Sequence, residues 1–111
     1  EPFSDGGGPV TVKALLSDQV QVADIYTTTP AIADNDLVVL EDPKNNFIAQ
    51  QVLPLYNKAK MTDKAKEALN AVSKQLTTED LINLNRAVGG SEKQNPKDAA
   101  AAWLKEKGLV K

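Results

Sequence analysis

The sequence predicts an α/β fold, with short strands in the first half of the chain and three helices in the second. Runs of β-branched and aliphatic residues at 20–25, 37–40 and 51–56 have the length and composition of strands. Beyond Lys58, apolar residues recur at spacings of three and four, as on one face of a helix. Capping residues bracket these later segments, which strengthens the helix prediction.

Composition excludes several classes of function. The 111 residues include 13 basic and 15 acidic side chains, with a net charge of -2, so no basic surface for nucleic acid or anionic lipid is indicated. The chain has no cysteine and no histidine, which removes disulfides, thiolate metal sites and the commonest general base. We therefore predict no catalytic residue, no cofactor and no metal ligand. No apolar run has the length of a membrane span.

The first predicted element is a helix over about 10–18. It follows a loop that ends in Gly6, Gly7 and Gly8, and Pro9 is suited to its first turn. Backbone N–H groups at such a helix start can hold an anion, and Thr11 is a candidate ligand-binding residue there. The alternative is that the glycines only permit a tight turn.

The second element is a strand over 20–25, which leads into a candidate ligand site. This run is apolar almost throughout, as in a buried parallel strand. It is followed by Tyr26 and the hydroxyls of Thr27, Thr28 and Thr29. An aromatic ring beside hydroxyls suits a small polar or cationic ligand, so Tyr26, Thr27 and Thr28 are predicted to bind it. Alternatively, Tyr26 only covers the end of the sheet, with its hydroxyl in water.

A helical turn at 31–35 and two further strands complete the first half. The strand at 37–40 ends at Glu41, Asp42 and Pro43 because proline cannot donate to a strand ladder. The strand at 51–56 contains Pro54, which restricts it to a sheet edge or a strand end.

Three helices are predicted for the second half, each with its own start signal. The expected caps are, in chain order, Thr62 or Asp63, a capping box of Thr77 and Asp80, and Asn95 followed by Pro96. Gly89 and Gly90 end the second helix, and Gly108 ends the third in a left-handed conformation. Trp103 is expected on the core side of the last helix as a packing residue.

Several of these segments together resemble a known family. The run GGGPVTVKALLSDQVQVADIYTTTPAIADNDLVVLEDPK is similar to part of the substrate-binding proteins of osmoprotectant ABC importers, which take up glycine betaine, choline, carnitine or proline betaine. That family shows a strand reading roughly VDVADIYST and then DLVVLEDDK in the same order. The resemblance continues through LNAVSKQLTTEDLINLNRAV and KDAAAAWLKEKGLVK, so nearly the whole chain is covered.

The resemblance implies the C-terminal part of a two-lobed, periplasmic-binding-protein-like fold, which needs more chain than this. Residues 1–28 would be the remainder of the smaller lobe, ending at the hinge. Residues 29–111 would be the returning segment of the larger lobe with its C-terminal helices, and Glu1 a boundary rather than a biological start. The aromatic residue of the family's [YF][ST]T motif falls on Tyr26, whereas Thr29 stands where the family usually has an aspartate.

The implied function is non-enzymatic: capture of a quaternary-ammonium solute, such as glycine betaine, for an ABC permease. The implied location is extracytoplasmic, in a periplasm or on a lipid anchor, with the membrane reached only through the anchor or the permease and no nucleic-acid partner. These residues alone are expected to give no measurable heat with glycine betaine, and their uncovered surface suggests dimerisation or strand exchange. The alternative is a stand-alone helical protein-interaction or regulatory domain. An acid–base enzyme using Asp24, Glu41 or Asp42 has little support.

Overall fold

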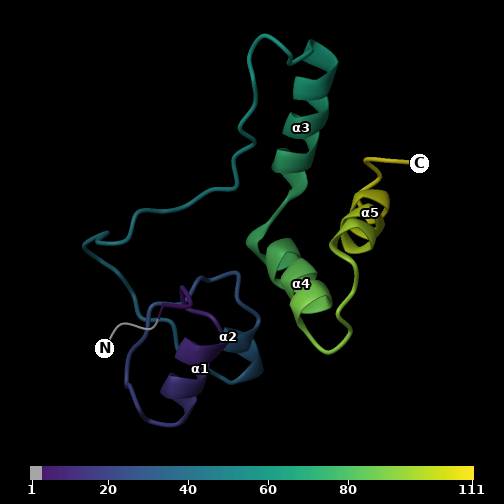
Figure 1. Cartoon of the computed structure of the whole chain (residues 1–111). Helices are drawn as coiled ribbons and strands as arrows, with labels where there is room; N and C mark the ends of the chain where they lie inside the picture. Colours follow the sequence, from purple (N-terminus) through teal and green to yellow (C-terminus); the bar gives the residue numbers. More distant parts are fainter. Residues whose placement is uncertain (1–3) are drawn as a thin grey trace. The chain divides into compact units, whose positions relative to one another are not determined.

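The structure, a computed structural model, describes residues 4–111. In this part of the chain five helices follow one another and no strand forms (Figure 1). They are α1 (Pro9–Leu16), α2 (Ala31–Asp34), α3 (Asp63–Gln75), α4 (Thr78–Gly89) and α5 (Pro96–Glu106). The chain divides into two compact units, Glu1–Val39 and Leu40–Lys111. No helix in residues 4–111 has the length and apolar character needed to cross a membrane.

The strand predictions for 20–25, 37–40 and 51–56 are wrong for this structure. These segments run without helix or strand, and many of their apolar side chains face solvent; Val38, for example, is 84% exposed. A β-strand requires a neighbouring strand to accept and donate its backbone hydrogen bonds. No such neighbour is found within residues 4–111. These segments therefore have the amino-acid composition of strands but do not form them.

In the first unit, α1 confirms the helix predicted over about 10–18. Pro9 occupies its first position, and the carboxylate of Asp5 accepts the backbone N–H groups of Val10 at 2.7 Å and Thr11 at 3.1 Å. The side chains of Val12 and Ala14 are buried. The helical turn predicted at 31–35 is also confirmed, as α2.

Two aspartates end these helices in the left-handed conformation that usually favours glycine. After α1, Asp18 has a φ of 57°, and the N–H of Gln19 donates to the carbonyl of Ala14 at 2.9 Å. After α2, Asp36 has a φ of 52° and the N–H of Leu37 donates to the carbonyl of Ile32 at 2.9 Å. Aspartate tolerates this conformation better than most residues. Each helix can therefore end at its aspartate, and the backbone turns there.

In the second unit, the predicted caps of α3 and α4 are confirmed. The hydroxyl of Thr62 accepts the N–H of Ala65 at 3.2 Å. At α4 the hydroxyl of Thr77 accepts the N–H of Asp80 at 3.1 Å, and the Asp80 carboxylate accepts the N–H of Thr77 at 2.9 Å. This reciprocal pair is the capping box expected from the sequence.

Both ends of α5 also follow the sequence signals. Asn95 caps the start by accepting the N–H of Lys97 at 2.9 Å. At the other end, Gly108 has a φ of 68°, and the N–H of Leu109 donates to the carbonyl of Leu104 at 2.9 Å. With the bond from the Gly108 N–H to the Lys105 carbonyl at 3.0 Å, this is a complete Schellman motif.

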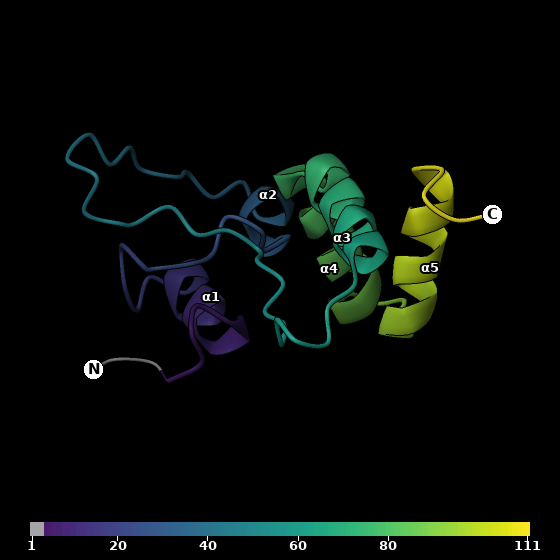
Figure 2. The same ribbon diagram turned by 90° about the horizontal axis from the view of Figure 1, so that it is seen from above.

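Helices α4 and α5 lie against each other (Figure 2), and a cluster of side chains joins them. Ala99 and Trp103 are the buried side chains of α5. Lys107 forms an ion pair with Asp80 at 3.0 Å, and its ammonium lies 5.8 Å from the centre of the Trp103 ring. The indole Nε1 of Trp103 is buried and has no partner of good hydrogen-bond geometry among the described residues. The packing role predicted for Trp103 is therefore confirmed.

The same cluster shifts the pKa values of its two charged residues, Asp80 and Lys107. The hydroxyl and backbone N–H of Thr77 hold the pKa of Asp80 well below its usual range, with further contributions from nearby Trp103 and Lys107. In return, the Asp80 carboxylate raises the pKa of Lys107. Both groups are therefore charged at neutral pH.

Candidate functional site

The predicted ligand residues Tyr26, Thr27 and Thr28 lie on a tight turn of the first unit. The N–H of Thr29 donates to the carbonyl of Tyr26 at 2.9 Å, which closes the turn. Tyr26 is 59% exposed, Thr27 is exposed and Thr28 is half-buried. The ring of Tyr26 is therefore accessible to a ligand and is not sealed in a hydrophobic interior.

The glycine loop packs against the segment that leads into this turn. Gly7 is buried with a φ of 79°, and a Cβ atom there would lie only 2.6 Å from the carbonyl oxygen of Asp24. No other residue fits this close approach without displacing backbone. Gly7 is thus required to hold the start of α1 next to the backbone that precedes Tyr26.

Thr11, the fourth predicted ligand residue, is placed differently. Its side chain is buried, and its hydroxyl and backbone N–H both donate to the carboxylate of Asp5. The Thr11 hydroxyl is the main cause that lowers the pKa of Asp5, and the N–H groups of Thr11 and Val10 add to it. The start of α1 therefore already holds a carboxylate, from the chain itself. An external anion would have to replace Asp5 there.

A cavity of about 600 Å³ lies within the first unit. One wall is the glycine loop, a second is one side of α1, and a third comes from the residues around the end of the Tyr26 turn. The lining residues are Gly6, Gly7, Gly8, Pro9, Val12, Lys13, Leu16, Ser17, Thr29 and Ala31. The four predicted ligand residues are not among them. The structure therefore brings the glycine loop and Thr29 together, but leaves Tyr26, Thr27, Thr28 and Thr11 outside this lining.

Sequence reasoning missed two polar members of this lining, Lys13 and Ser17, and it noted the hydroxyl of Thr29 beside Tyr26 without selecting Thr29 as a ligand residue. A signal was present for the α1 side, because Pro9, Val12, Lys13 and Leu16 recur at helical spacing and so share one face. Nothing local in the sequence places Thr29 opposite that face. Its position depends on how the turn folds back on α1.

The chemistry of the cavity favours noncovalent binding. Its walls are mainly apolar, and its polar groups are one ammonium and two hydroxyls, from Lys13, Ser17 and Thr29. Such a lining suits a small ligand with apolar bulk and one anionic or hydrogen-bonding end. Within residues 4–111, no group of three Asp, Glu, His or Cys side chains is arranged to hold a metal ion.

Comparison with known proteins places most of this chain in one family. Residues 7–106 match the family described as "Substrate binding domain of ABC-type glycine betaine transport system". The match includes Gly7 and Gly8 of the glycine loop, the Tyr26 turn and all five helices. The resemblance read from the sequence motifs is thereby confirmed. No solved structure matches the chain with statistical significance.

Proposed function

Because the chain belongs to the family of substrate-binding domains of ABC-type glycine betaine transport systems, we propose that it helps capture a quaternary-ammonium solute for import. Glycine betaine is the expected ligand, and choline, carnitine and proline betaine are its closest alternatives. The family match over residues 7–106 is the observation that carries this proposal. The accessible ring of Tyr26 supports it, because it gives this ligand class a suitable contact.

The cationic end of such a ligand needs an aromatic surface. A quaternary ammonium has no N–H to donate and spreads its charge over its methyl groups, so it is attracted to ring faces without directional hydrogen bonds. Each favourable contact contributes about 0.5 to 2 kcal/mol. Tyr26 supplies one such face, and the neighbouring cavity supplies apolar walls against which methyl groups can pack.

The carboxylate of a betaine needs donors, and the turn and cavity contain several. The hydroxyls of Thr27 and Thr28 stand next to the ring in sequence, and Lys13 and Thr29 contribute to the cavity lining. An ammonium and hydroxyls are suitable partners for a carboxylate. Thr11 takes part less directly, because its hydroxyl is donated to Asp5. We propose that Thr11 positions the start of α1 and contacts the ligand only when the Asp5 carboxylate moves away from it.

The wider setting of this proposal follows the family. A solute-binding component is not an enzyme; it delivers its ligand to the permease subunits of an ABC transporter. The proposed location is extracytoplasmic, where such a component meets its ligand before transport. Ligand contacts in these proteins would stabilise a closed arrangement of two lobes, so that binding shifts a pre-existing equilibrium.

The test is an NMR titration of the ¹⁵N-labelled chain with glycine betaine. One aromatic contact gives weak binding, with a dissociation constant on the order of millimolar or above. Shifts should be centred on the Tyr26 turn. The Tyr26→Phe variant keeps the ring face and should bind normally, whereas Tyr26→Ala should bind about 2- to 30-fold more weakly.

Two controls make this titration specific. Glycine has the carboxylate without the methyl groups, so it should not shift the Tyr26 resonances. Tyr56→Ala removes the other tyrosine, which is 45% exposed and lies outside the turn, and should leave binding unchanged. Equal shifts with glycine and glycine betaine, or equal losses for the two alanine variants, would overturn the proposed site.

A further inference from the structure

One carboxylate on α4, that of Asp80, takes part in two sets of contacts at once. Its Oδ2 atom accepts the backbone N–H of Thr77 at 2.9 Å and the Thr77 hydroxyl at 2.7 Å, as part of the capping box at the start of α4. Its Oδ1 atom lies 3.0 Å from the ammonium of Lys107, at the end of α5. The cap of one helix and the attachment of another therefore depend on the same side chain.

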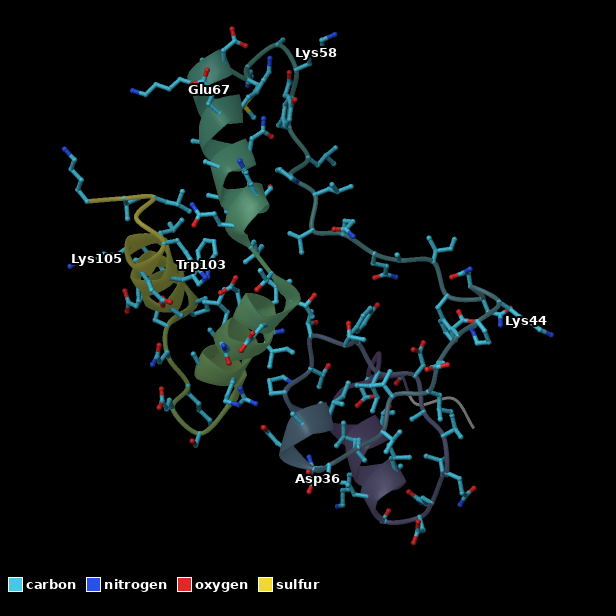
Figure 3. All side chains as sticks on the ribbon, turned by 180° about the vertical axis from the view of Figure 1, so that it is seen from behind. Asp36, Lys44, Lys58, Glu67, Trp103 and Lys105 are labelled. Carbon is cyan, nitrogen blue, oxygen red and sulfur yellow. The ribbon has the colours of Figure 1, made fainter. Side chains whose placement is uncertain are left out.

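The end of α5 fixes Lys107 next to this carboxylate. Lys107 directly precedes the left-handed Gly108, and its N–H donates to the carbonyl of Trp103 at 3.0 Å. Figure 3 shows Trp103 on the side of α5 towards α4. The Lys107 ammonium lies 5.8 Å from the centre of the Trp103 ring, within the range of a cation–π attraction. This ammonium is therefore held between a ring of its own helix and a carboxylate of α4.

Both side chains of this ion pair are largely shielded from water. The exposed fractions are 13% for Asp80 and 27% for Lys107, whereas in the pair on α3 they are 93% for Asp63 and 43% for Lys66. Water and salt weaken a shielded pair less than a surface pair, so the shielded pair restrains its members more strongly. The contact with Lys107 can therefore hold the Asp80 carboxylate in the orientation that the cap requires.

We propose that Asp80 is a latch between the two helices, which makes the capping of α4 and the docking of α5 interdependent. Ordering a side chain costs conformational entropy, and here a single ordering of Asp80 serves both sets of contacts. When Lys107 is attached, Asp80 is already oriented for Thr77, and when the cap is formed, Asp80 is already oriented for Lys107. Release of α5 therefore loosens the first turn of α4, and loss of the cap loosens α5.

A double-mutant cycle measures this coupling. Thr77→Ala removes the hydroxyl of the cap, and Lys107→Met removes the ammonium while keeping a long unbranched side chain. Thr77→Ala should raise the equilibrium constant of unfolding less in the Lys107→Met chain than in the unmodified chain, with the two ratios differing about two-fold or more. Urea denaturation followed by circular dichroism gives the four constants. Lys107→Arg keeps the charge and should preserve the full effect of Thr77→Ala.

The matched control is the cap of α3. Thr62→Ala removes an equivalent hydroxyl, which accepts the N–H of Ala65 at 3.2 Å at the start of a different helix. Its effect on unfolding should be the same with and without Lys107→Met, because its cap does not use Asp80. A cycle at Thr77 that is as additive as the cycle at Thr62 overturns the proposal.

The single tryptophan of the chain gives a second readout, which needs no change at Lys107. The buried indole N–H of Trp103 contributes one signal to the ¹⁵N NMR spectrum. Thr77→Ala should shift or broaden this signal, because it frees the Asp80 carboxylate near the indole. Thr78→Ala, which is exposed and outside the capping box, should leave it unchanged. An indole signal that does not respond to Thr77→Ala, or that responds equally to both variants, overturns the proposal.

Discussion

The helical region of residues 62–109 and the extended region of residues 37–58 differ in where their hydrogen bonds are made. In the helical region most backbone hydrogen bonds join residues a few positions apart, and the start of each helix is closed by a neighbouring side chain such as Thr62 or Asn95. The extended region has a similarly clear sequence pattern, but the second strand that it needs is not among residues 4–111. Local signals are therefore sufficient for the first pattern and insufficient for the second.

One turn within the extended region is held by local hydrogen bonds, as the helices are. The Asp42 carboxylate accepts the N–H of Phe47 at 2.8 Å and the side-chain amide of Asn46 at 3.2 Å. These contacts, the Phe47 N–H above all, hold the pKa of Asp42 below its usual range. This turn forms because its bonds are local, whereas the flanking segments find no partner strand within residues 4–111.

The largest expected effect tests what holds the helical region together. Trp103 is 8% exposed, so Trp103→Ala should destabilise the α4–α5 contact by about 3 to 5 kcal/mol. Urea denaturation followed by far-ultraviolet circular dichroism measures this loss. The control is Lys105→Ala, whose exposed side chain projects away from α3 and α4 in Figure 3 and should change stability by less than about 0.5 kcal/mol. Equal effects would show that Trp103 is not the packing centre.

Two glycines should respond with opposite signs. Gly108 has a φ of 68°, so Gly108→Ala should cost about 1 to 2 kcal/mol. Gly89 is the last residue of α4, and a Cβ atom there would meet no other atom within 4 Å. Gly89→Ala should therefore stabilise the helix, by up to about 1 kcal/mol. Thermal denaturation of both variants checks the signs, and a stabilising Gly108→Ala would contradict the Schellman motif.

A smaller effect is expected at the capping box. Thr77→Ala removes the hydroxyl that accepts the N–H of Asp80, at a cost of about 1 kcal/mol. Thr78→Ala, one residue later and exposed, removes no capping bond and should be nearly neutral. Denaturation midpoints of the pair distinguish the cap from a general effect of threonine.

The smallest effect is a dependence on pH. Folding lowers the pKa of Asp80 below its ordinary value of 3.8, so the stabilisation is complete above that pH and is lost as the pH falls towards the lowered pKa. Folding raises the pKa of Lys107 above 10.5, so its contribution is complete below that pH and is lost as the pH rises through the raised pKa. Melting temperatures at acid pH should vary less in Asp80→Asn than in the unmodified chain.

Sequence reasoning located the helices because their signals are complete within a few residues. Thr77 and Asp80 define the start of α4, and Gly108 defines the end of α5, without reference to any distant residue. The same reasoning placed strands at 20–25, 37–40 and 51–56. The side chains there suit a strand, but no neighbouring strand pairs with them within residues 4–111. The strand rule describes side chains that suit a sheet, and it does not supply the neighbouring strand.

The candidate site was predictable to a smaller extent. The exposed ring of Tyr26 agrees with the expectation of an accessible aromatic at the end of an apolar run. The involvement of Thr11 with Asp5 was not anticipated, because a carboxylate six residues upstream can reach the start of α1 only when the glycine loop turns back. The cavity beside Thr29 likewise depends on Gly7 packing against the Asp24 backbone.

Amide hydrogen exchange tests the central contrast most directly. The helix amides of α3, α4 and α5 should be protected, because their hydrogen bonds are made within each helix. The amides of 48–53 should exchange freely, because no backbone hydrogen bond joins them to the rest of residues 4–111. Protection of 48–53 equal to that of the helix amides would contradict the account.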